Sequence, residues 1–209
     1  MKIYDLSPEI SENMAVYKNM PERKPKLILT RMIREGANES RLQIDLHTGS
    51  HVDAPYHFLK NGKTIDKIDL DKFMGKCIVL DFTKIKNQII KKNFLEKSFF
   101  AKLNMKDTII LLKTKNIADK LFSHNFVYLE KTGAEYLASK YIKAVGLDSL
   151  SIERDQPNHE THKILLSNNI IIFEGLDLSK VTEGRYFFYG LPLKIKNGDG
   201  SPIRAVLVE

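Results

Sequence analysis

The sequence has few cysteines, which form disulfides, few prolines and glycines, which interrupt helices and strands, and no tryptophan. It contains one cysteine, 7 prolines, 11 glycines and no tryptophan. The single cysteine, Cys77, excludes an intramolecular disulfide, and its apolar surroundings indicate a buried strand. The low glycine and proline content excludes collagen-like and disordered proteins. The longest apolar runs, such as residues 109–112, are far too short to span a bilayer.

These absences, together with an N-terminal segment that lacks an apolar signal region, predict a soluble, cytoplasmic protein with no membrane partner. Hydrophobic residues make up 43% and charged residues 28% of the 209 residues, so the chain can bury a core of ordinary size. No linker, repeat or change in composition divides it. We therefore expect one domain over residues 1–209.

Short runs of β-branched and aromatic residues are the dominant pattern. Eight of them have the length of strands: residues 27–31, 42–46, 76–82, 108–113, 144–147, 170–174, 186–191 and 205–208. Helices are expected at residues 91–104, 132–140 and 158–168. The mixture predicts an α/β or α+β fold in which strands are in the majority.

A net charge of +7 raises the question of a polyanionic partner. Lysines crowd between residues 84 and 106, where Glu96 is the only acid. Nucleic-acid binding requires arginines and aromatics interleaved on one surface, whereas Phe94, Phe99 and Phe100 have spacings that suit the packing of a helix. We expect a solvated helix face and no nucleic-acid partner. A steep salt dependence of binding to DNA or RNA would indicate the opposite.

One segment, residues 47–58, carries a pattern with chemical meaning: His-Thr-Gly-Ser-His-Val-Asp-Ala-Pro-Tyr-His-Phe. Its glycine and proline oppose a helix. In an extended chain with a period of two, four candidate ligands project to the same side: His47, His51, Asp53 and His57. A bend at the glycine or the proline would let three or four of them converge. Imidazole and carboxylate groups suit zinc, manganese or iron(II), and three protein ligands leave a position open for catalysis.

Other catalytic patterns are incomplete in this chain. Residues 62–64, Gly-Lys-Thr, lack the glycine five positions earlier that a phosphate-binding loop requires. Residues 159–162, His-Glu-Thr-His, place the second histidine one position too early for a zinc-protease helix. There is no Gly-x-Ser-x-Gly elbow, and Cys77 has no His or Asn close by in the sequence. Serine and cysteine hydrolases therefore lack support.

The segment 47–57 resembles the signature His-x-Gly-Thr-His-x-Asp-x-Pro-x-His of the metal-dependent cyclase family, whose best-known members are bacterial kynurenine formamidases. The likeness continues at residues 4–10, 145–151, 191–194 and 200–205. The resemblance implies an α/β fold of the swivelling β/β/α type, in which a mixed sheet forms a partly closed barrel with helices outside. It also implies a homodimer or a larger homo-oligomer.

The resemblance further implies that two divalent metal ions, zinc or manganese, share one site. The implied ligands are His47, His51, Asp53, His162 and Glu174. Asp53 would bridge the two metals. The last two ligands match a family pattern of a His and a Glu twelve residues apart, and the neighbouring His159, which has the wrong spacing, is expected at the surface.

His57 matches the family's catalytic histidine, which would give a proton to the departing amine. The implied reaction is hydrolysis of a small-molecule substrate, N-formylkynurenine, to kynurenine and formate, a step of tryptophan catabolism. Tyr17 stands where kynurenine formamidases carry a tryptophan that contacts the substrate, which leaves the aryl substrate open. The alternatives are another cyclic or aryl amide or lactone, such as isatin, and a non-catalytic metal-binding role.

Overall fold

The computed structural model describes residues 1–85, 88–98, 100–115 and 122–209. The strands of its main sheet are β1 (Ile3–Asp5), β4 (His51–Asp53), β5 (Met74–Asp81), β7 (Ile109–Lys113), β9 (Ala144–Leu147), β10 (Ile171–Glu174), β11 (Gly184–Tyr189), β12 (Gly200–Pro202) and β13 (Val206–Val208). Two further pairs are β2 (Lys26–Arg31) with β3 (Glu39–Gln43), and β6 (Ile89–Ile90) with β8 (Tyr128–Leu129). The α-helices are α1 (Lys92–Lys97), α2 (Lys131–Ser139) and α3 (Glu160–Ser167).

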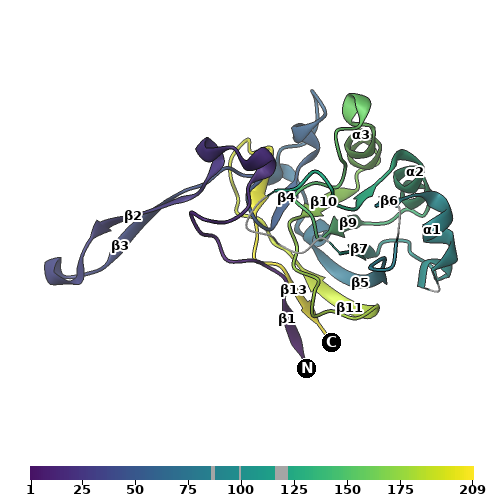
Figure 1. The fold of residues 1–209 in the computed structure, drawn as a ribbon, viewed down its shortest axis with the longest axis horizontal. Helices are drawn as coiled ribbons and strands as arrows, with labels where there is room; N and C mark the ends of the chain where they lie inside the picture. The colour runs from purple at the N-terminus through teal and green to yellow at the C-terminus, as the bar shows by residue number, and fades with distance from the viewer. Residues whose placement is uncertain (86–87, 99, 116–121) are drawn as a thin grey trace.

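The main sheet has nine strands in the order β1-β13-β11-β5-β7-β9-β10-β4-β12. Its four central strands, from β5 to β10, are parallel, and the strands on both sides pair antiparallel. The sheet curls into a half-barrel with the three helices on its outside (Figure 1). The predicted α/β fold with a mixed, partly closed sheet and flanking helices is confirmed.

Alternation along the central strands divides the core into two apolar layers. In β5, Ile78 and Leu80 face a cluster shared with the helices, whereas Cys77 and Val79 face the inside of the half-barrel. Residues 109–112 of β7 alternate in the same way between the two layers. Because both faces are buried, these strands consist almost entirely of apolar residues. Cys77 is 1% exposed, as the sequence predicts.

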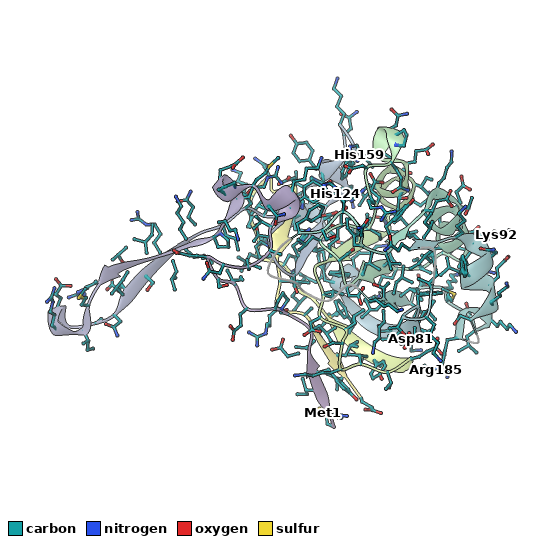
Figure 2. The ribbon with its side chains drawn as sticks, viewed as in Figure 1. Met1, Asp81, Lys92, His124, His159 and Arg185 are labelled. Atoms are coloured by element: carbon teal, nitrogen blue, oxygen red, sulfur yellow. The ribbon has the colours of Figure 1, made fainter. Side chains whose placement is uncertain are left out.

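Strands β2 and β3 form a ribbon that projects away from the body (Figure 1). Every residue of both strands is exposed, and Figure 2 shows their side chains standing free on the two sides of the ribbon. Cross-strand pairing places Leu27 beside Leu42, and Leu29 lies on the same face of the ribbon. These three side chains are 65%, 47% and 52% exposed, so one face of the arm is apolar without a core beneath it.

Several expected boundaries differ from the structure. The strand expected at 42–46 is β3, which lies three residues earlier, at 39–43. The helix expected at 91–104 is α1 followed by a 3₁₀ turn at Phe100–Lys102, because Ser98 is extended and its hydroxyl donates to Glu183. Helix α3 begins at Glu160 rather than 158, because Asn158 and His159 have left-handed backbones.

The lysine-rich segment packs as its aromatic spacing predicts. Phe94 and Phe100 lie against the cluster between sheet and helices, while the lysines of α1 are exposed. Lys86 and Phe99 lie outside the described residues. Within the described part of the chain, no helix combines the length and apolar character that crossing a membrane requires.

Candidate metal centre

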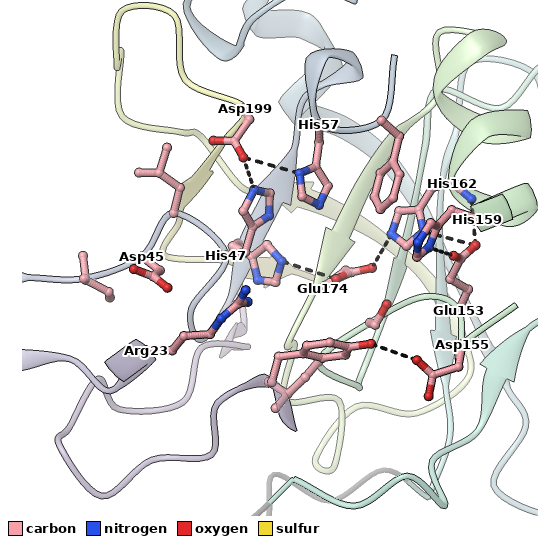
Figure 3. Close-up of a pocket in the computed structure, with 17 residues that line it drawn as sticks. Arg23, Asp45, His47, His57, Glu153, Asp155, His159, His162, Glu174 and Asp199 are labelled. Atoms are coloured by element: carbon pink, nitrogen blue, oxygen red, sulfur yellow. Dashed lines mark hydrogen bonds and ion pairs between the residues drawn. The ribbon is translucent and has the colours of Figure 1, made fainter. Parts of the chain in front are cut away.

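A cavity of about 560 Å³ opens at the end of the sheet where β4 and β10 meet the N-terminal segment (Figure 3). It is lined by Tyr17, Arg23, Ile44, Asp45, Leu46, His47, His51, His57, Phe58, Leu150, Ser151, Glu153, Asp155, His159, His162, Glu174 and Asp199. Six of the seven residues that the sequence singles out line this cavity, and the seventh, Asp53, is buried behind it.

The antiparallel pairing of β4 with β10 brings two of the expected ligands together. His51 stands directly opposite Glu174, and their side chains share a face of the sheet. Nε2 of His51 lies 3.3 Å from Oε2 of Glu174 and 3.6 Å from Oδ1 of Asp53. Nδ1 of His51 lies 2.9 Å from the carbonyl oxygen of Gly49, which fixes the ring's direction. Gly49 has φ +66°, so the expected bend in the motif is present there.

His47 and His162 approach the same two carboxylates from other elements. Nδ1 of His47, which precedes the bend, lies 2.8 Å from Oδ1 of Asp53. His162 projects from the first turns of α3, and its Nε2 lies 3.3 Å from Oε1 of Glu174 and 3.6 Å from Oδ2 of Asp53. The ring of Phe58 stacks on that of His162, with centroids 4.2 Å apart.

The five expected ligands form two groups that share one carboxylate. In the first group, single donor atoms of His47, His51 and Asp53 lie within 4.8 Å of one another, and in the second so do those of Asp53, His162 and Glu174. Within the described residues, Oδ2 of Asp53 is buried and has no hydrogen-bond partner. A buried carboxylate oxygen without a partner costs free energy that a cation would offset. The donor set therefore suits divalent metal ions.

The electrostatics of the cluster favour the ionised form of its acids. Burial opposes charge on Asp53, but His162 and His47 hold the pKa of that carboxyl well below its ordinary value. Burial also opposes charge on His47, yet Asp53 and Asp199 raise the pKa of this imidazole to about 9. Contacts with His162 and His51 lower the pKa of Glu174 against burial and the charge of Asp53. Anionic carboxylates are the form that binds a metal, and a metal would displace the imidazole protons.

His57 reaches the cavity from a 3₁₀ turn, Pro55–His57, rather than from the expected extended chain. Pro55 starts this turn, because its ring fixes φ in the range a helical turn needs. The ring of His57 stacks on His47 at 3.9 Å, and its Nδ1 lies 3.4 Å from Oδ2 of Asp199. His47, His57 and Asp199 form a third group with donor atoms within 4.8 Å. Burial lowers the pKa of His57.

Tyr17 lies on the N-terminal wall of the cavity, in the 3₁₀ turn Tyr17–Asn19. Its hydroxyl donates to Oδ1 of Asp155 at 3.5 Å, and its ring meets Phe122 edge to face. Arg23 is the only arginine or lysine among the described lining residues, and no described acid lies within ion-pair distance of it. The site thus offers one aromatic ring and one unpaired cation on the same wall.

Sequence reasoning missed two acids of the site, Asp199 and Glu153. Asp199 follows Gly198, close to the start of β12, and its Oδ2 lies 2.9 Å from Nε2 of His47. Glu153 is 3% exposed and lies between His159 and His162. His159 is exposed, as expected, but it also lines the cavity. Neither acid carries a signal in the sequence, because the burial that gives Glu153 its partners is set by the fold.

Comparison with known proteins places the chain in a family. The family model Cyclase matches residues 4–154. Cyclase-like protein 2 of Arabidopsis thaliana is 31% identical over 100% of this chain and 79% of its own length. The chain belongs to the cyclase family.

Two further relatives of this cyclase-family chain bear on its activity. A kynurenine formamidase of Bacillus anthracis is 27% identical, and the match covers 99% of this chain and 97% of that protein. A solved structure described as a potential metal-dependent hydrolase with cyclase activity is 42% identical, with a TM-score of 0.87 over 99% of this chain and 96% of that one. The chain is an enzyme of this family, a metal-dependent hydrolase.

Proposed function

We propose that this cyclase-family enzyme hydrolyses the amide bond of N-formylkynurenine, releasing formate and kynurenine. The observation that carries the proposal is the pair of ligand groups that share Asp53, with the imidazole of His57 beside them in the same cavity. The similarity to a kynurenine formamidase over nearly the whole of both chains supports this substrate.

In this proposal the residues hold two divalent metals, most simply zinc, with manganese as the alternative. Asp53 belongs to both ligand groups, with His47 and His51 in one and with His162 and Glu174 in the other, and would be the ligand they share. Divalent metals at such ligands supply Lewis acidity, which activates water near neutral pH and polarises a carbonyl group. The protein's part is to keep the carboxylates ionised, which the neighbouring imidazoles do, and to hold His51 beside Glu174, which the register of β4 against β10 does.

His57 is the proposed acid and base. Because burial lowers its pKa, the ring is neutral near pH 7 and can accept a proton before giving it to the departing amine. The carboxylate of Asp199, 3.4 Å from Nδ1 of His57, orients the ring so that Nε2 is free for the substrate. Asp199 therefore acts as a positioning residue for His57.

The remaining lining residues fit an aryl amide with a charged group. Ile44, Leu46 and Leu150 supply apolar surface, and Tyr17 can stack against an aryl ring. Arg23, which pairs with no acid in the described part of the chain, can meet a carboxylate such as that of an amino-acid side group. Tyr17 in place of tryptophan offers less stacking area, which favours a smaller cyclic amide such as isatin, or a lactone, as the second candidate.

The proposal is tested by metal analysis of the purified protein and by formate release from N-formylkynurenine. We expect bound divalent metal, and a kcat for His57→Ala that is about 10²- to 10⁴-fold below that of the wild type. Tyr56→Ala, in the same turn but exposed and outside the cavity, is the matched control and should keep wild-type activity.

Three outcomes separate the alternatives. A metal-loaded protein that leaves N-formylkynurenine intact but opens isatin or a lactone refutes the substrate and keeps the reaction class. If His57→Ala loses metal as well as activity, His57 is a ligand rather than the acid and base. A metal-loaded wild type that turns over no amide or lactone of the panel supports the non-catalytic role.

We also propose that the enzyme is a homodimer joined through the arm of β2 and β3. A two-stranded ribbon is marginally stable alone, and the apolar face of Leu27, Leu29 and Leu42 is exposed, with no described residue covering it. We expect a dimer by light scattering after size exclusion, and a monomer after all three leucines are changed to serine. Lys26→Ser, on the opposite face, is the control; a monomeric wild type at micromolar concentration contradicts the proposal.

A further inference from the structure

Glu153 is a buried carboxylate beside the cluster that the proposed function leaves without a role. Its Oε1 lies 2.5 Å from Nδ1 of His159, and its Oε2 accepts the backbone N–H of His162 at 3.3 Å. The same Oε2 lies 3.2 Å from the ring Nδ1 of His162, in a direction that makes no hydrogen bond, so this pair is an electrostatic contact. Figure 3 shows Glu153 beside the two histidines. One carboxylate thus touches both the backbone and the ring of His162.

The two nitrogens of the His162 ring face different surroundings. Nδ1 faces Glu153, whereas Nε2 faces Glu174 at 3.3 Å and Asp53 at 3.6 Å. An ionised carboxylate only accepts hydrogen bonds, so the neighbour of Nδ1 favours a hydrogen on that nitrogen. In the neutral ring, the lone pair then belongs to Nε2, which is the nitrogen that faces the other proposed ligands.

Stacking on Phe58 does not by itself decide which nitrogen faces the cluster. The rings of Phe58 and His162 are 29° from parallel, which restrains the plane of the imidazole. A half-turn of the ring about χ2 keeps that plane and exchanges the sides on which the nitrogen and carbon atoms lie. Among the described neighbours of His162, Glu153 is the one whose carboxylate lies beside Nδ1, at 3.2 Å. The choice between the two orientations therefore depends on Glu153.

We infer that Glu153 is a positioning residue, which fixes the ring orientation and the tautomer of His162 so that the lone pair of Nε2 faces Asp53 and Glu174. The inference rests on the proposed function only in taking Nε2 of His162 as a metal ligand. Partners of this kind behind a ligating histidine typically change metal affinity by about 10- to 100-fold. His159 supports the arrangement by occupying Oε1, which leaves Oε2 for His162.

The experiment measures zinc affinity and ring chemistry rather than turnover. Zinc binding to the metal-free protein is followed by calorimetry for the wild type, Glu153→Gln and Glu153→Asp. Glu160→Gln is the matched control, because Glu160 lies on α3, the helix that carries His162, and pairs with Lys131 at the surface. Long-range ¹H–¹⁵N spectra of the zinc-loaded protein identify which nitrogen of His162 carries hydrogen. Circular dichroism verifies that each variant is folded.

We expect one zinc equivalent to bind about 10- to 100-fold more weakly in Glu153→Gln, with partial recovery in Glu153→Asp and no change in Glu160→Gln. We also expect hydrogen on Nδ1 of His162 in the wild type. A Glu153→Gln affinity within twofold of the wild type overturns the inference, and so does a wild-type spectrum with hydrogen on Nε2. A wild-type spectrum with hydrogen on Nε2 counts against the inference even if Glu153→Gln does not fold.

These results are separable from the proposed function. A wild type that binds zinc and turns over no amide refutes the substrate while the affinities of the Glu153 variants still decide this inference. A wild type that binds no divalent metal overturns both.

Discussion

Gly175, next to Glu174, lies against the backbone of Gly49, close to His51, so adding one methyl group at Gly175 should strongly destabilise the fold. Gly175 follows Glu174 and has φ +66°, a conformation that costs a residue with a Cβ about 1–2 kcal/mol. A Cβ there would lie 2.8 Å from the carbonyl carbon of Gly49 and closer still to its oxygen. Real Cβ atoms essentially never come within 3.0 Å of such atoms, so backbone must move.

Overpacking of this kind costs typically about 1–3 kcal/mol, so Gly175→Ala should lower the free energy of unfolding by about 2–5 kcal/mol in total. The carbonyl oxygen that must move is also the one that orients Nδ1 of His51. Metal affinity should therefore fall in the fraction that remains folded. The measurements are urea unfolding of the metal-free protein and calorimetric zinc binding at a temperature where the variant is folded.

The control for this prediction is Gly184→Ala in β11. A Cβ at Gly184 meets its nearest atom, on the ring of Tyr186, at 3.4 Å, an ordinary contact, and no positive φ is present. Its free energy of unfolding should change by less than about 1 kcal/mol. The reasoning is refuted if Gly175→Ala loses less than about 1 kcal/mol, or if both variants lose the same amount.

Three further predictions concern acids and metal. Asp199→Asn should lower kcat for N-formylkynurenine about tenfold or more with little change in KM, because the substitution removes the charge that orients His57. Steady-state kinetics test this prediction. A change in KM of about tenfold with an unchanged kcat contradicts it. Burial raises the pKa of Asp148 to about 7, so the stability this residue contributes is present below about pH 4 and is lost as pH rises through 7. Relative to Asp148→Asn, the wild type should lose about 4 kcal/mol over that range in urea unfolding, and a constant difference refutes the shift. Removing metal with a chelator should lower the Tm, and added zinc should restore it.

The sequence predicts best the strands that are buried on both faces of the sheet. The strands β5, β7, β9 and β10 were expected at nearly their observed positions, because continuous apolar runs have few other solutions. The motif was expected as extended chain, and β4 is extended, but its place in the main sheet was not expected, because His51 and Asp53 do not have the composition of a buried strand. The two-residue strands β6 and β8 are too short to leave a pattern.

The candidate site divides along similar lines. The residues of one local motif, from His47 to His57, could be found because their spacing is short and their chemistry is shared. His162 and Glu174 depended on a family pattern, and no spacing connects Asp199 or Glu153 with the motif. Asp199 lies between two glycines and resembles an ordinary turn residue. Asp199 reaches the site because the adjacent strand β12 pairs with β4, about 150 positions earlier in the chain.

That pairing has a consequence for the order in which the protein is made. Strand β12 pairs with β4, and β13 lies between β1 and β11. The strands that are synthesised first can therefore complete their pairing only after the last strands have been synthesised. Contacts of such high sequence separation form slowly, because the entropy cost of closing the long loop between the strands precedes the free energy gained from their contacts. A chain still emerging from a ribosome holds His47 and Asp53 without Asp199. Nascent chains of this enzyme should therefore stay inactive until the last strands are released.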